Sequence, residues 1–465
     1  MPAMAAMIAE RTLAELRRSF RGPVVQPQDP DYEDTRRIWN AAIERRPALI
    51  ARCSDVSDVV AAVRVAREHD LLTAVRGGGH NVSGSALCDG GMVIDLSLLR
   101  AVAVDPERRT ARVQAGARLG DVDGACQPFS LAVPAGINTT TGVAGLTLGG
   151  GIGWLMRRHG LTCDSLVGAE VVTADGSVVR ASESENADLL WGLRGGGGNF
   201  GIVTAFDFRL AEVGPQVCGG VVFYPAEEAA DVLRGYAEYA ANAPEEVTTI
   251  LALRRIPPFP AFPEAMWGRP VVGIAACHAG RPADGEGALE PLRHLGNPLL
   301  DRLGVTPFLV QQSLFDATVP RGWRYYWRSE YLRRLDGEAI DVLVDNAWSC
   351  AAPLSYTLLA HMGGAVRALS DDDAAFTGRG AEHSININMV QRDRSEPDDT
   401  DWARRFHGEV QPCSAGGVYV NFLGNEGAQR VRHAYGEEKW ARLVELKRRW
   451  DPSNFFRVNQ NIPPE

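Results

Sequence analysis

Apolar residues recur at helical spacing from position 54 to 70, where one face carries Val56, Val59, Val60 and Val63. Short apolar runs then predict strands at 71–75, 92–96, 111–114 and 170–173, and Asp175-Gly176 predicts a hairpin turn into a strand at 177–180. Helix and strand alternate without the regular spacing of a doubly wound sheet. The pattern therefore predicts an α+β fold.

The pattern changes after Val213-Gly214-Pro215 to amphipathic helices, aromatic stretches and a proline-rich loop at 256–263. A chain of 465 residues exceeds the size at which one hydrophobic core usually stops growing. We therefore expect one domain at 1–213, a second at 214–415, and a segment at 416–465 that returns to the first. The last segment contains a predicted helix with Trp440, Leu443 and Val444 on one face.

Composition narrows the class of protein. The 48 basic and 58 acidic residues give a net charge of -10, which repels nucleic-acid backbones. The 8 cysteines are scattered without the paired spacing of a disulfide framework or metal site, so we expect no metal and a reducing compartment. Residues 1–20 read as an amphipathic helix and not a signal peptide, and no apolar run is long enough for a membrane helix. These features predict a cytoplasmic protein that binds neither membrane nor nucleic acid.

Two glycine-rich stretches, at 76–95 and 134–164, each carry one nucleophilic side chain, His80 and Cys163. Glycine has no Cβ, so its backbone N–H groups can close on a ligand, and such loops often hold phosphates. The first stretch lies between two predicted strands and lacks GxxxxGK[ST], which excludes a P-loop. A third cluster, RGGGGNFGIVTAFDFRL at 194–210, is typical of a tight turn that leads into a strand.

The motif RGGGH, followed by PAG and then GGGIGWLMRRHGLTCD, resembles the berberine bridge enzyme-like branch of the vanillyl-alcohol-oxidase flavoproteins. The resemblance runs from about residue 31 to the C-terminal DPSNFFRVNQNIP. It implies a PCMH-type, two-lobed FAD-binding domain and a substrate domain with an antiparallel sheet covered by helices. It also implies FAD bound covalently through His80 at the flavin C8 methyl group and through Cys163 at C6.

The resemblance further implies that the glycine stretches and the C-terminal tail contact FAD, with the third glycine cluster at its adenine end. Besides His80 and Cys163, the expected cofactor-binding residues are Arg76, Gly77, Gly78, Gly79, Asn81, Ser83, Pro134, Ala135, Gly136, Thr140, Gly142, Gly145, Gly149, Gly150, Gly153, Gly201, Ile202, Asn421 and Asn459.

Tyr419 is the first candidate for the catalytic base, and it shares a face with Asn421 if GGVYVNF forms a strand. A phenol near flavin N5 could take the substrate proton if its neighbours lower its pKa from about 10. The alternative is a core tyrosine with a satisfied hydroxyl group. Some relatives carry the basic tyrosine at the position of Phe422, which leaves the identity of the base open, and Tyr356 is the second candidate.

Two further predicted strands should face the flavin, one with Tyr356 and His361 and the other with Asn386 and Asn388. Several relatives place a carboxylate in the second strand, but Ser384, Ile385 and Asn386 are not acidic, and packing or hydrogen bonding is the alternative role. Two adjacent tyrosines, Tyr325 and Tyr326, are candidates to line the cleft.

Leu166 lies where the family's C-x-x-V or C-x-x-I pattern is thought to control the access of dioxygen to the flavin. Leucine matches neither form, so an oxidase is preferred without excluding other acceptors. The resemblance implies an FAD-dependent oxidase that removes a hydride from a bulky small molecule and reduces dioxygen to hydrogen peroxide. Substrates of secondary-metabolite, alkaloid, polyketide, amine or sugar type suit this chemistry. The alternatives are a dehydrogenase with another acceptor and a flavoprotein that catalyses a redox-neutral rearrangement or only binds a ligand.

Overall fold

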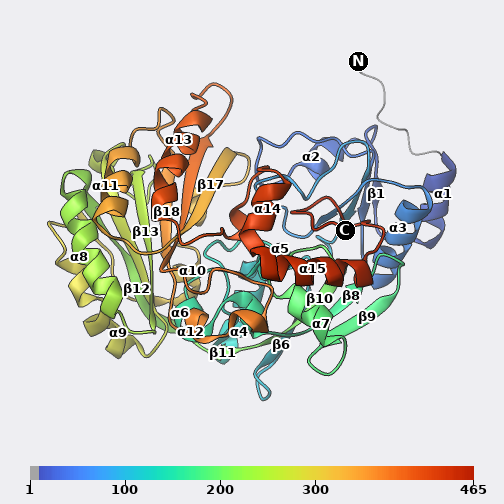
Figure 1. The fold of residues 1–465 in the computed structure, drawn as a ribbon, viewed down its shortest axis with the longest axis horizontal. Helices are drawn as coiled ribbons and strands as arrows, with labels where there is room; N and C mark the ends of the chain where they lie inside the picture. The colour runs from blue at the N-terminus through green and yellow to red at the C-terminus, as the bar shows by residue number, and fades with distance from the viewer. Residues whose placement is uncertain (1–9) are drawn as a thin grey trace.

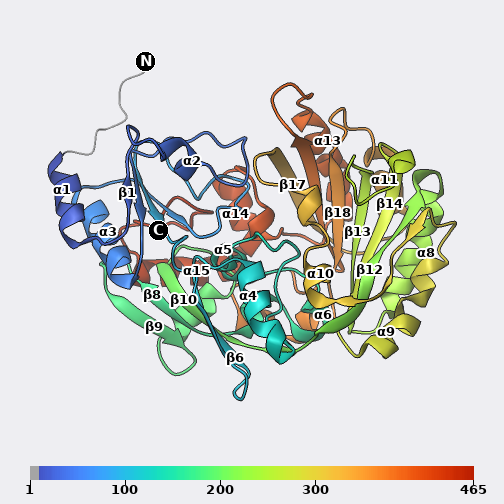
Figure 2. The same cartoon turned by 180° about the vertical axis from the view of Figure 1, so that it is seen from behind.

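A computed structural model describes residues 10–465, which form two lobes side by side (Figure 1; seen from behind in Figure 2). The first described element is helix α1 (Glu10–Ser19), which confirms part of the predicted N-terminal helix. Residues 1–9 lie outside the described range. Helices and mostly antiparallel sheets make up both lobes, so the predicted α+β class is confirmed.

The first lobe begins with a four-stranded sheet in the order β1-β2-β4-β3. Its inner strand β4 pairs in parallel with both β2 and β3. Helix α3 (Val56–Glu68) buries Val59 and Val63, as the valine spacing predicts, and Asp55 caps it by accepting a hydrogen bond from the Asp58 amide. The strands are β1 (Val24–Val25), β2 (Leu49–Arg52), β3 (Thr73–Arg76) and β4 (Met92–Asp95), and helix α2 (Tyr32–Arg36) lies between β1 and β2 in the chain.

A second sheet in this lobe has the order β5-β6-β10-β8-β9 and is antiparallel throughout. Its strands are β5 (Val102–Asp105), β6 (Thr110–Gln114), β8 (Leu166–Val172), β9 (Val178–Ser182) and β10 (Ile202–Arg209). The predicted strand at 111–114 falls in β6, and those at 170–173 and 177–180 overlap β8 and β9. Short elements connect these strands: α4 (Leu119–Cys126), β7 (Leu131–Ala132), α5 (Val143–Gly149), α6 (Met156–His159), α7 (Ala187–Leu193) and β11 (Ala211–Glu212).

The second lobe is built on one large antiparallel sheet in the order β15-β12-β14-β13-β18-β19-β17, with β16 paired to β12. Four helices cover its outer face, and its other face turns toward the first lobe (Figure 1). The strands are β12 (Gln216–Pro225), β13 (Val247–Arg255), β14 (Pro270–His278), β15 (Leu300–Asp301), β16 (Gly304–Pro307), β17 (Arg324–Leu332), β18 (Tyr356–His361) and β19 (His383–Gln391). The covering helices are α8 (Ala229–Asn242), α9 (Pro282–Leu289), α11 (Gly337–Asn346) and α13 (Thr400–Val410), and α10 (Phe308–Gln312) and α12 (Ala365–Ala368) lie in the connections.

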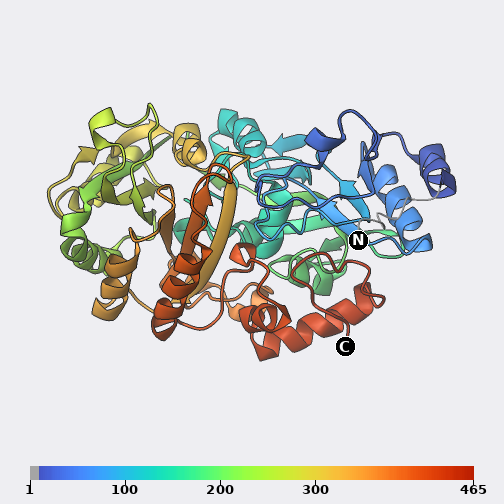
Figure 3. The ribbon, with the colours of Figure 1, turned by 90° about the horizontal axis from the view of Figure 1, so that it is seen from above.

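The C-terminal segment returns to the first lobe through α14 (Ala428–Tyr435) and α15 (Glu437–Trp450), which lie along one side of that lobe (Figure 3). Trp440, Leu443 and Val444 are buried in the same apolar core as the residues of α3, β4 and β8, as the predicted helix face requires. A fully buried ion pair joins Lys447 to Asp451 at 2.7 Å. The core of the covering lobe is separate and uses residues 218–413, and the domain boundaries at 213/214 and 415/416 remain our proposal.

No helix within residues 10–465 is both long and apolar enough to cross a membrane.

Candidate active site

One cavity lies between the glycine loops of the first lobe and the inner face of the covering sheet. The backbones of the two glycine stretches are packed together at its edge: a Cβ atom at Gly78 would lie 2.4 Å from the backbone of Gly142. Only glycine allows this approach. The contact brings the loop after β3 against the loop before α5, so His80 and Thr140 meet although 60 residues separate them.

His80 is held at the cavity wall by contacts on two sides. Its Nε2 atom lies 3.1 Å from the Thr140 hydroxyl, and the ring of Trp39 stacks on it with centroids 5.1 Å apart. Burial, with smaller contributions from the charges of Arg118 and Arg321, lowers the pKa of His80 to about 3. The imidazole is therefore neutral at physiological pH, which is the form that acts as a nucleophile.

The expected second flavin link through Cys163 stays a prediction, and the geometry argues against it. Its side chain is fully buried, packs in an apolar cluster with Trp154, Leu161 and Tyr419, and is not among the residues that line the cavity. Its Sγ atom donates only a weak 3.7 Å bond to Asp164, and burial raises the pKa of the thiol, so the reactive thiolate is suppressed. Cysteine identity in a glycine-rich context could not reveal that the side chain points into the protein core.

Tyr419 and Asn421 meet, but not through the predicted strand. Residues 420–422 form a single 3-10 turn, and Asn421 Nδ2 donates to the Tyr419 hydroxyl oxygen at 2.8 Å. The backbone N–H of Gly151 donates to the same oxygen, also at 2.8 Å. Burial raises the pKa of Tyr419 to about 12 although these donors favour the phenolate. The pKa is therefore raised and not lowered as expected, so the basic phenolate is a minor form at neutral pH.

The covering sheet presents alternate residues to the cavity. In β18, Tyr356, Leu358 and Ala360 line the cavity, whereas His361 lies on the opposite face, where it stacks on His383 at 5.2 Å. The expectation that His361 faces the flavin is therefore wrong, because it is an odd number of residues from Tyr356. In β19, Ser384, Asn386 and Asn388 line the cavity as the strand period requires.

The tyrosine pair at the start of β17 does not line the cavity. Tyr325 is buried against Trp39, with ring centroids 3.8 Å apart, and Tyr326 lies under the guanidinium groups of Arg328 and Arg404. Trp327, the next residue, lines the cavity instead. Leu166, which we expected beside the flavin, is fully buried in the core of the first lobe and does not line the cavity.

Many of the expected cofactor-binding residues do come together at the cavity. Those that line it are Gly77, Gly78, Gly79, His80, Asn81, Gly136, Gly142, Gly145, Gly201, Ile202, Asn421 and Asn459. Thr140 contacts the site through His80. The expected residues outside the lining are Arg76, Ser83, Pro134, Ala135, Gly149, Gly150, Gly153 and Cys163. Arg76, for example, is buried in an ion pair with Asp95 at 2.6 Å, which makes it a structural residue of the parallel sheet.

The sequence analysis did not predict several other residues that line the cavity. They are Trp39, Asn138, Thr141, Asn199, Arg254, Phe315 and Trp327, among others. Trp39 lies in an irregular segment between α2 and β2, where no periodic pattern marks it. Asn138 and Thr141 stand within the second glycine stretch, so their proximity to Gly136 and Gly142 was the available signal. Arg254 is the penultimate residue of β13 and follows the apolar run at 250–253, where a buried charge is itself unusual.

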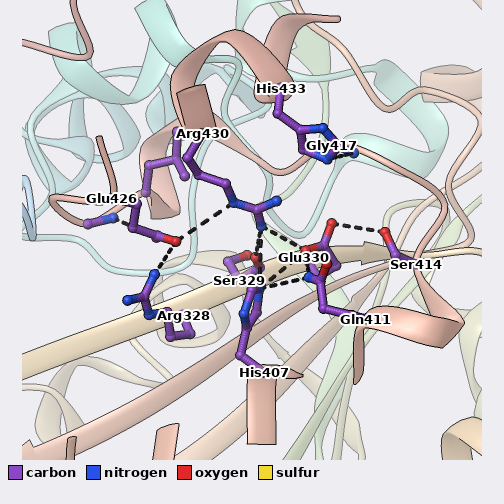
Figure 4. Close-up of polar contacts among 12 residues, drawn as sticks. Arg328, Ser329, Glu330, His407, Gln411, Ser414, Gly417, Glu426, Arg430 and His433 are labelled. Carbon is purple, nitrogen blue, oxygen red and sulfur yellow. Dashed lines mark hydrogen bonds and ion pairs between the residues drawn. The ribbon is translucent and has the colours of Figure 1, made fainter. Parts of the chain in front are cut away.

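A buried polar cluster joins the C-terminal segment to the covering sheet (Figure 4). Glu330 of β17 accepts hydrogen bonds from Arg430 at 2.7 Å, His407 at 3.2 Å and Ser414 at 2.9 Å. Burial opposes ionisation of Glu330, but the His407 hydrogen bond and the Arg430 charge outweigh it and hold the pKa of Glu330 below its ordinary value. Arg430 also pairs with Glu426, which in turn pairs with Arg328. The cluster therefore holds both ends of the segment that carries Tyr419 and Asn421.

Comparison with known families identifies two matching regions. Residues 47–182 match an FAD binding domain, and residues 418–463 match the "berberine and berberine like" family. The chain is 31% identical over 462 residues to an FAD-linked oxidoreductase from Dictyostelium discoideum, with 98% of each protein covered. It is 28% identical over 467 residues to (R)-6-hydroxynicotine oxidase from Paenarthrobacter nicotinovorans, covering 96% of this chain and 98% of the relative.

Solved structures share the whole fold. The crystal structure of 6-hydroxy-D-nicotine oxidase from Arthrobacter nicotinovorans superposes with a TM-score of 0.85 at 27% identity, covering 96% of this chain and 99% of the other. A xylooligosaccharide oxidase from Myceliophthora thermophila, solved with xylobiose, gives a TM-score of 0.84 at 23% identity, with 98% and 99% covered. At 23% identity, the similarity to the xylooligosaccharide oxidase shows a shared fold only.

Proposed function

The chain belongs to the berberine bridge enzyme-like FAD-linked oxidoreductases, and on that premise we propose an oxidase with FAD attached through His80 alone. The neutral imidazole of His80 at the cavity wall is the observation that carries this proposal. A bulky small molecule is the proposed substrate and dioxygen the proposed electron acceptor. The second attachment through Cys163 is not part of the proposal, because its sulfur lies in the core.

The residues of the cavity fit an FAD group. Glycines from all three predicted clusters line it, so backbone N–H groups can approach a dinucleotide without side chains in the way. The Oδ1 atoms of Asn459 and Asn138 are buried without a partner, which leaves polar atoms for a ligand to satisfy. His80 would hold the flavin ring, and Gly198, Asn199 and Asn459 would contact the far end of the cofactor.

Flavin, when bound, supplies a hydride acceptor. We propose that the Tyr419 oxygen accepts the substrate proton. Gly151 and Asn421 each donate a 2.8 Å hydrogen bond to this oxygen, and both bonds stabilise the phenolate. Asn421 is a positioning residue in this scheme. Since burial raises the pKa of Tyr419 to about 12, its basic form becomes more abundant as the pH rises. Tyr356, which lines the opposite wall, is the second candidate.

The cavity wall formed by the covering sheet supports a bulky substrate. Residues from four strands of the covering sheet form this wall, and they include apolar side chains and the unpaired amide oxygens of Asn386 and Asn388, so the wall can contact a large and partly polar molecule. Relatives are named for oxidation of a hydroxynicotine and of oligosaccharides, which are both larger than simple alcohols. We extend to this chain only the common feature, a bulky substrate of secondary-metabolite or sugar type.

The proposal is tested by mixing the flavin-loaded protein with a panel of bulky substrates without air and recording flavin bleaching. Oxidase activity predicts bleaching followed by one hydrogen peroxide per substrate when air is admitted. Bleaching without peroxide formation, with rapid reoxidation by a quinone, would assign a dehydrogenase instead. Conversion of a substrate without bleaching or oxygen uptake would assign the redox-neutral alternative.

A further inference from the structure

Four side chains form a row across the covering sheet and face the cavity. The strand pairing places Arg254 of β13 opposite Tyr356 of β18, Tyr356 opposite Asn388 of β19, and Asn388 opposite Trp327 of β17. All four residues line the cavity. Neighbouring strands are about 4.8 Å apart, so the row extends over roughly 14 Å.

Arg254 differs from the other buried arginines of residues 10–465. Arg76 and Arg379 are paired with carboxylates, and the terminal nitrogens of Arg157 bond to backbone carbonyl oxygens. Arg254 is 5% exposed, and its Nε atom donates to the carbonyl oxygen of Arg255 at 3.3 Å. Within the described chain its two terminal nitrogens have no hydrogen-bond or ion-pair partner. A buried guanidinium without an anion is costly, so a ligand that supplies the anion gains affinity there.

The charge of the cavity lining points the same way. Arg254 is the one charged side chain in this lining, since it includes no aspartate, glutamate or lysine and His80 is neutral. Burial lowers the pKa of Arg254 to about 10, so it stays protonated at neutral pH. A cationic substrate would therefore meet like charge and no carboxylate, whereas an anionic substrate would meet a desolvated cation.

The middle of the row offers hydrogen-bond acceptors. Asn388 Nδ2 donates to the Asn386 carbonyl at 2.8 Å, which leaves Asn388 Oδ1 buried without a partner, and Asn386 Oδ1 is also unpaired. Trp327 Nε1 at the far end of the row is an unpaired donor. These groups suit hydroxyl groups on a rigid scaffold that extends from Arg254 along the row.

The cofactor does not account for Arg254. The glycine loops suited to the phosphates of FAD belong to the first lobe, whereas Arg254 comes from the covering sheet, where it lies beside Tyr356 with its guanidinium carbon 5.2 Å from the ring centroid. We propose that Arg254 binds a carboxylate of the substrate, and that the substrate is a hydroxylated aromatic or polycyclic acid. This inference rests on the proposed function and names the substrate class of that site.

The test measures binding to the flavin-loaded protein by calorimetry, with 6-hydroxy-2-naphthoate and its neutral analogue 6-hydroxy-2-naphthamide as probes. The wild-type protein should bind the acid at least about tenfold more tightly than the amide, since a charge-assisted bidentate pair is stronger than a neutral one. Arg254→Gln should abolish this preference. Arg254→Lys keeps the charge but cannot donate two parallel hydrogen bonds to a carboxylate, so it should retain part of the preference.

Arg255→Gln is the matched control. Arg255 is the next residue of β13, and its terminal nitrogens bond to the carbonyl oxygens of Gly268 and Trp348. Its replacement should leave the preference for the acid unchanged. Equal affinities of the wild-type protein for acid and amide, failure of both to bind at millimolar concentration, or an unchanged preference in Arg254→Gln would overturn the proposal. Because binding is measured without turnover, these outcomes are independent of whether the protein proves to be an oxidase.

Discussion

Asn421 Nδ2 lies 2.8 Å from the hydroxyl oxygen of Tyr419, and the N–H of Gly151 in the second glycine stretch donates to the same oxygen at the same distance. The tyrosine thus joins the C-terminal tail to the second glycine stretch. The same two bonds that position the phenol also favour its ionised form, in opposition to burial. Structural and catalytic roles of Tyr419 are therefore separable by experiment.

Replacement of the hydroxyl group tests the catalytic role. Tyr419→Phe should slow anaerobic flavin reduction about a hundredfold, the usual contribution of a positioned base. It should also cost about 1–3 kcal/mol of stability, because the Gly151 and Asn421 donors lose their acceptor. Tyr435→Phe is the control, since Tyr435 is equally buried in α14 and bonds to Gly195 away from the cavity lining. A similar slowing in both variants would mean that the loss is structural.

The pH dependence gives an independent test. Because the pKa of Tyr419 is raised to about 12, the fraction of phenolate should rise about tenfold per pH unit between pH 7 and 10. Stopped-flow flavin reduction in the wild-type protein should follow this slope, and Tyr419→Phe should flatten it. A rate that is level across this range would assign proton removal to another group, and Tyr356→Phe is then the next variant.

The cluster around Glu330 should control acid stability (Figure 4). Glu330→Gln removes the charge that pairs with Arg430, and we expect a loss of about 2–4 kcal/mol in the free energy of unfolding. The lowered pKa of Glu330 means that its contribution is present above the unfolded value of about 4.3 and is lost as the pH falls through the folded value.

Denaturant unfolding of the two proteins at pH 7 and pH 3.5 checks this prediction. The difference in the free energy of unfolding between the wild-type and Glu330→Gln proteins should be smaller at pH 3.5 than at pH 7. Glu409→Gln serves as the control. Glu409 is exposed and lies in the same lobe, where it accepts a hydrogen bond from Asn346 at 2.7 Å. A difference of equal size at both pH values would contradict the assigned role of the Glu330 charge.

Leu166 should have no part in the oxygen reaction. It is fully buried, and its carbonyl oxygen accepts two hydrogen bonds from Arg194, at 3.1 Å and 2.7 Å. Leu166→Ile keeps the side-chain volume and should cost under about 1.5 kcal/mol. Stopped-flow reoxidation at matched oxygen should be the same for both proteins. A clear change in the reoxidation rate would restore this position as a control point for dioxygen.

The sequence predicted the fold class and most of one wall of the site, because both follow from local patterns. Valine spacing marked α3, and glycine runs marked the loops that the Gly78–Gly142 contact brings together. The orientation of single side chains was harder to predict. Cys163 lies within the second glycine stretch and Leu166 follows it, but both side chains turn into the core, because burial of apolar surface decides where such side chains point.

The opposite wall depends on contacts between distant strands. Arg254, Tyr356, Asn388 and Trp327 form a row only through the register of four strands, and the other three residues are 73 to 134 positions from Arg254 in the sequence. No pattern within one strand reveals which residues stand opposite one another, because the register is set by the assembled sheet. The same holds for Trp39, which reaches His80 from a segment without regular structure.

The central claim is that His80, and not Cys163, attaches the flavin. The most direct measurement is the intact mass of acid-denatured wild-type, His80→Ala and Cys163→Ala proteins. We predict one covalently bound FAD in the wild-type and Cys163→Ala proteins and none in His80→Ala. Release of free FAD from the denatured wild-type protein, or a flavin adduct that persists in His80→Ala, would contradict the account.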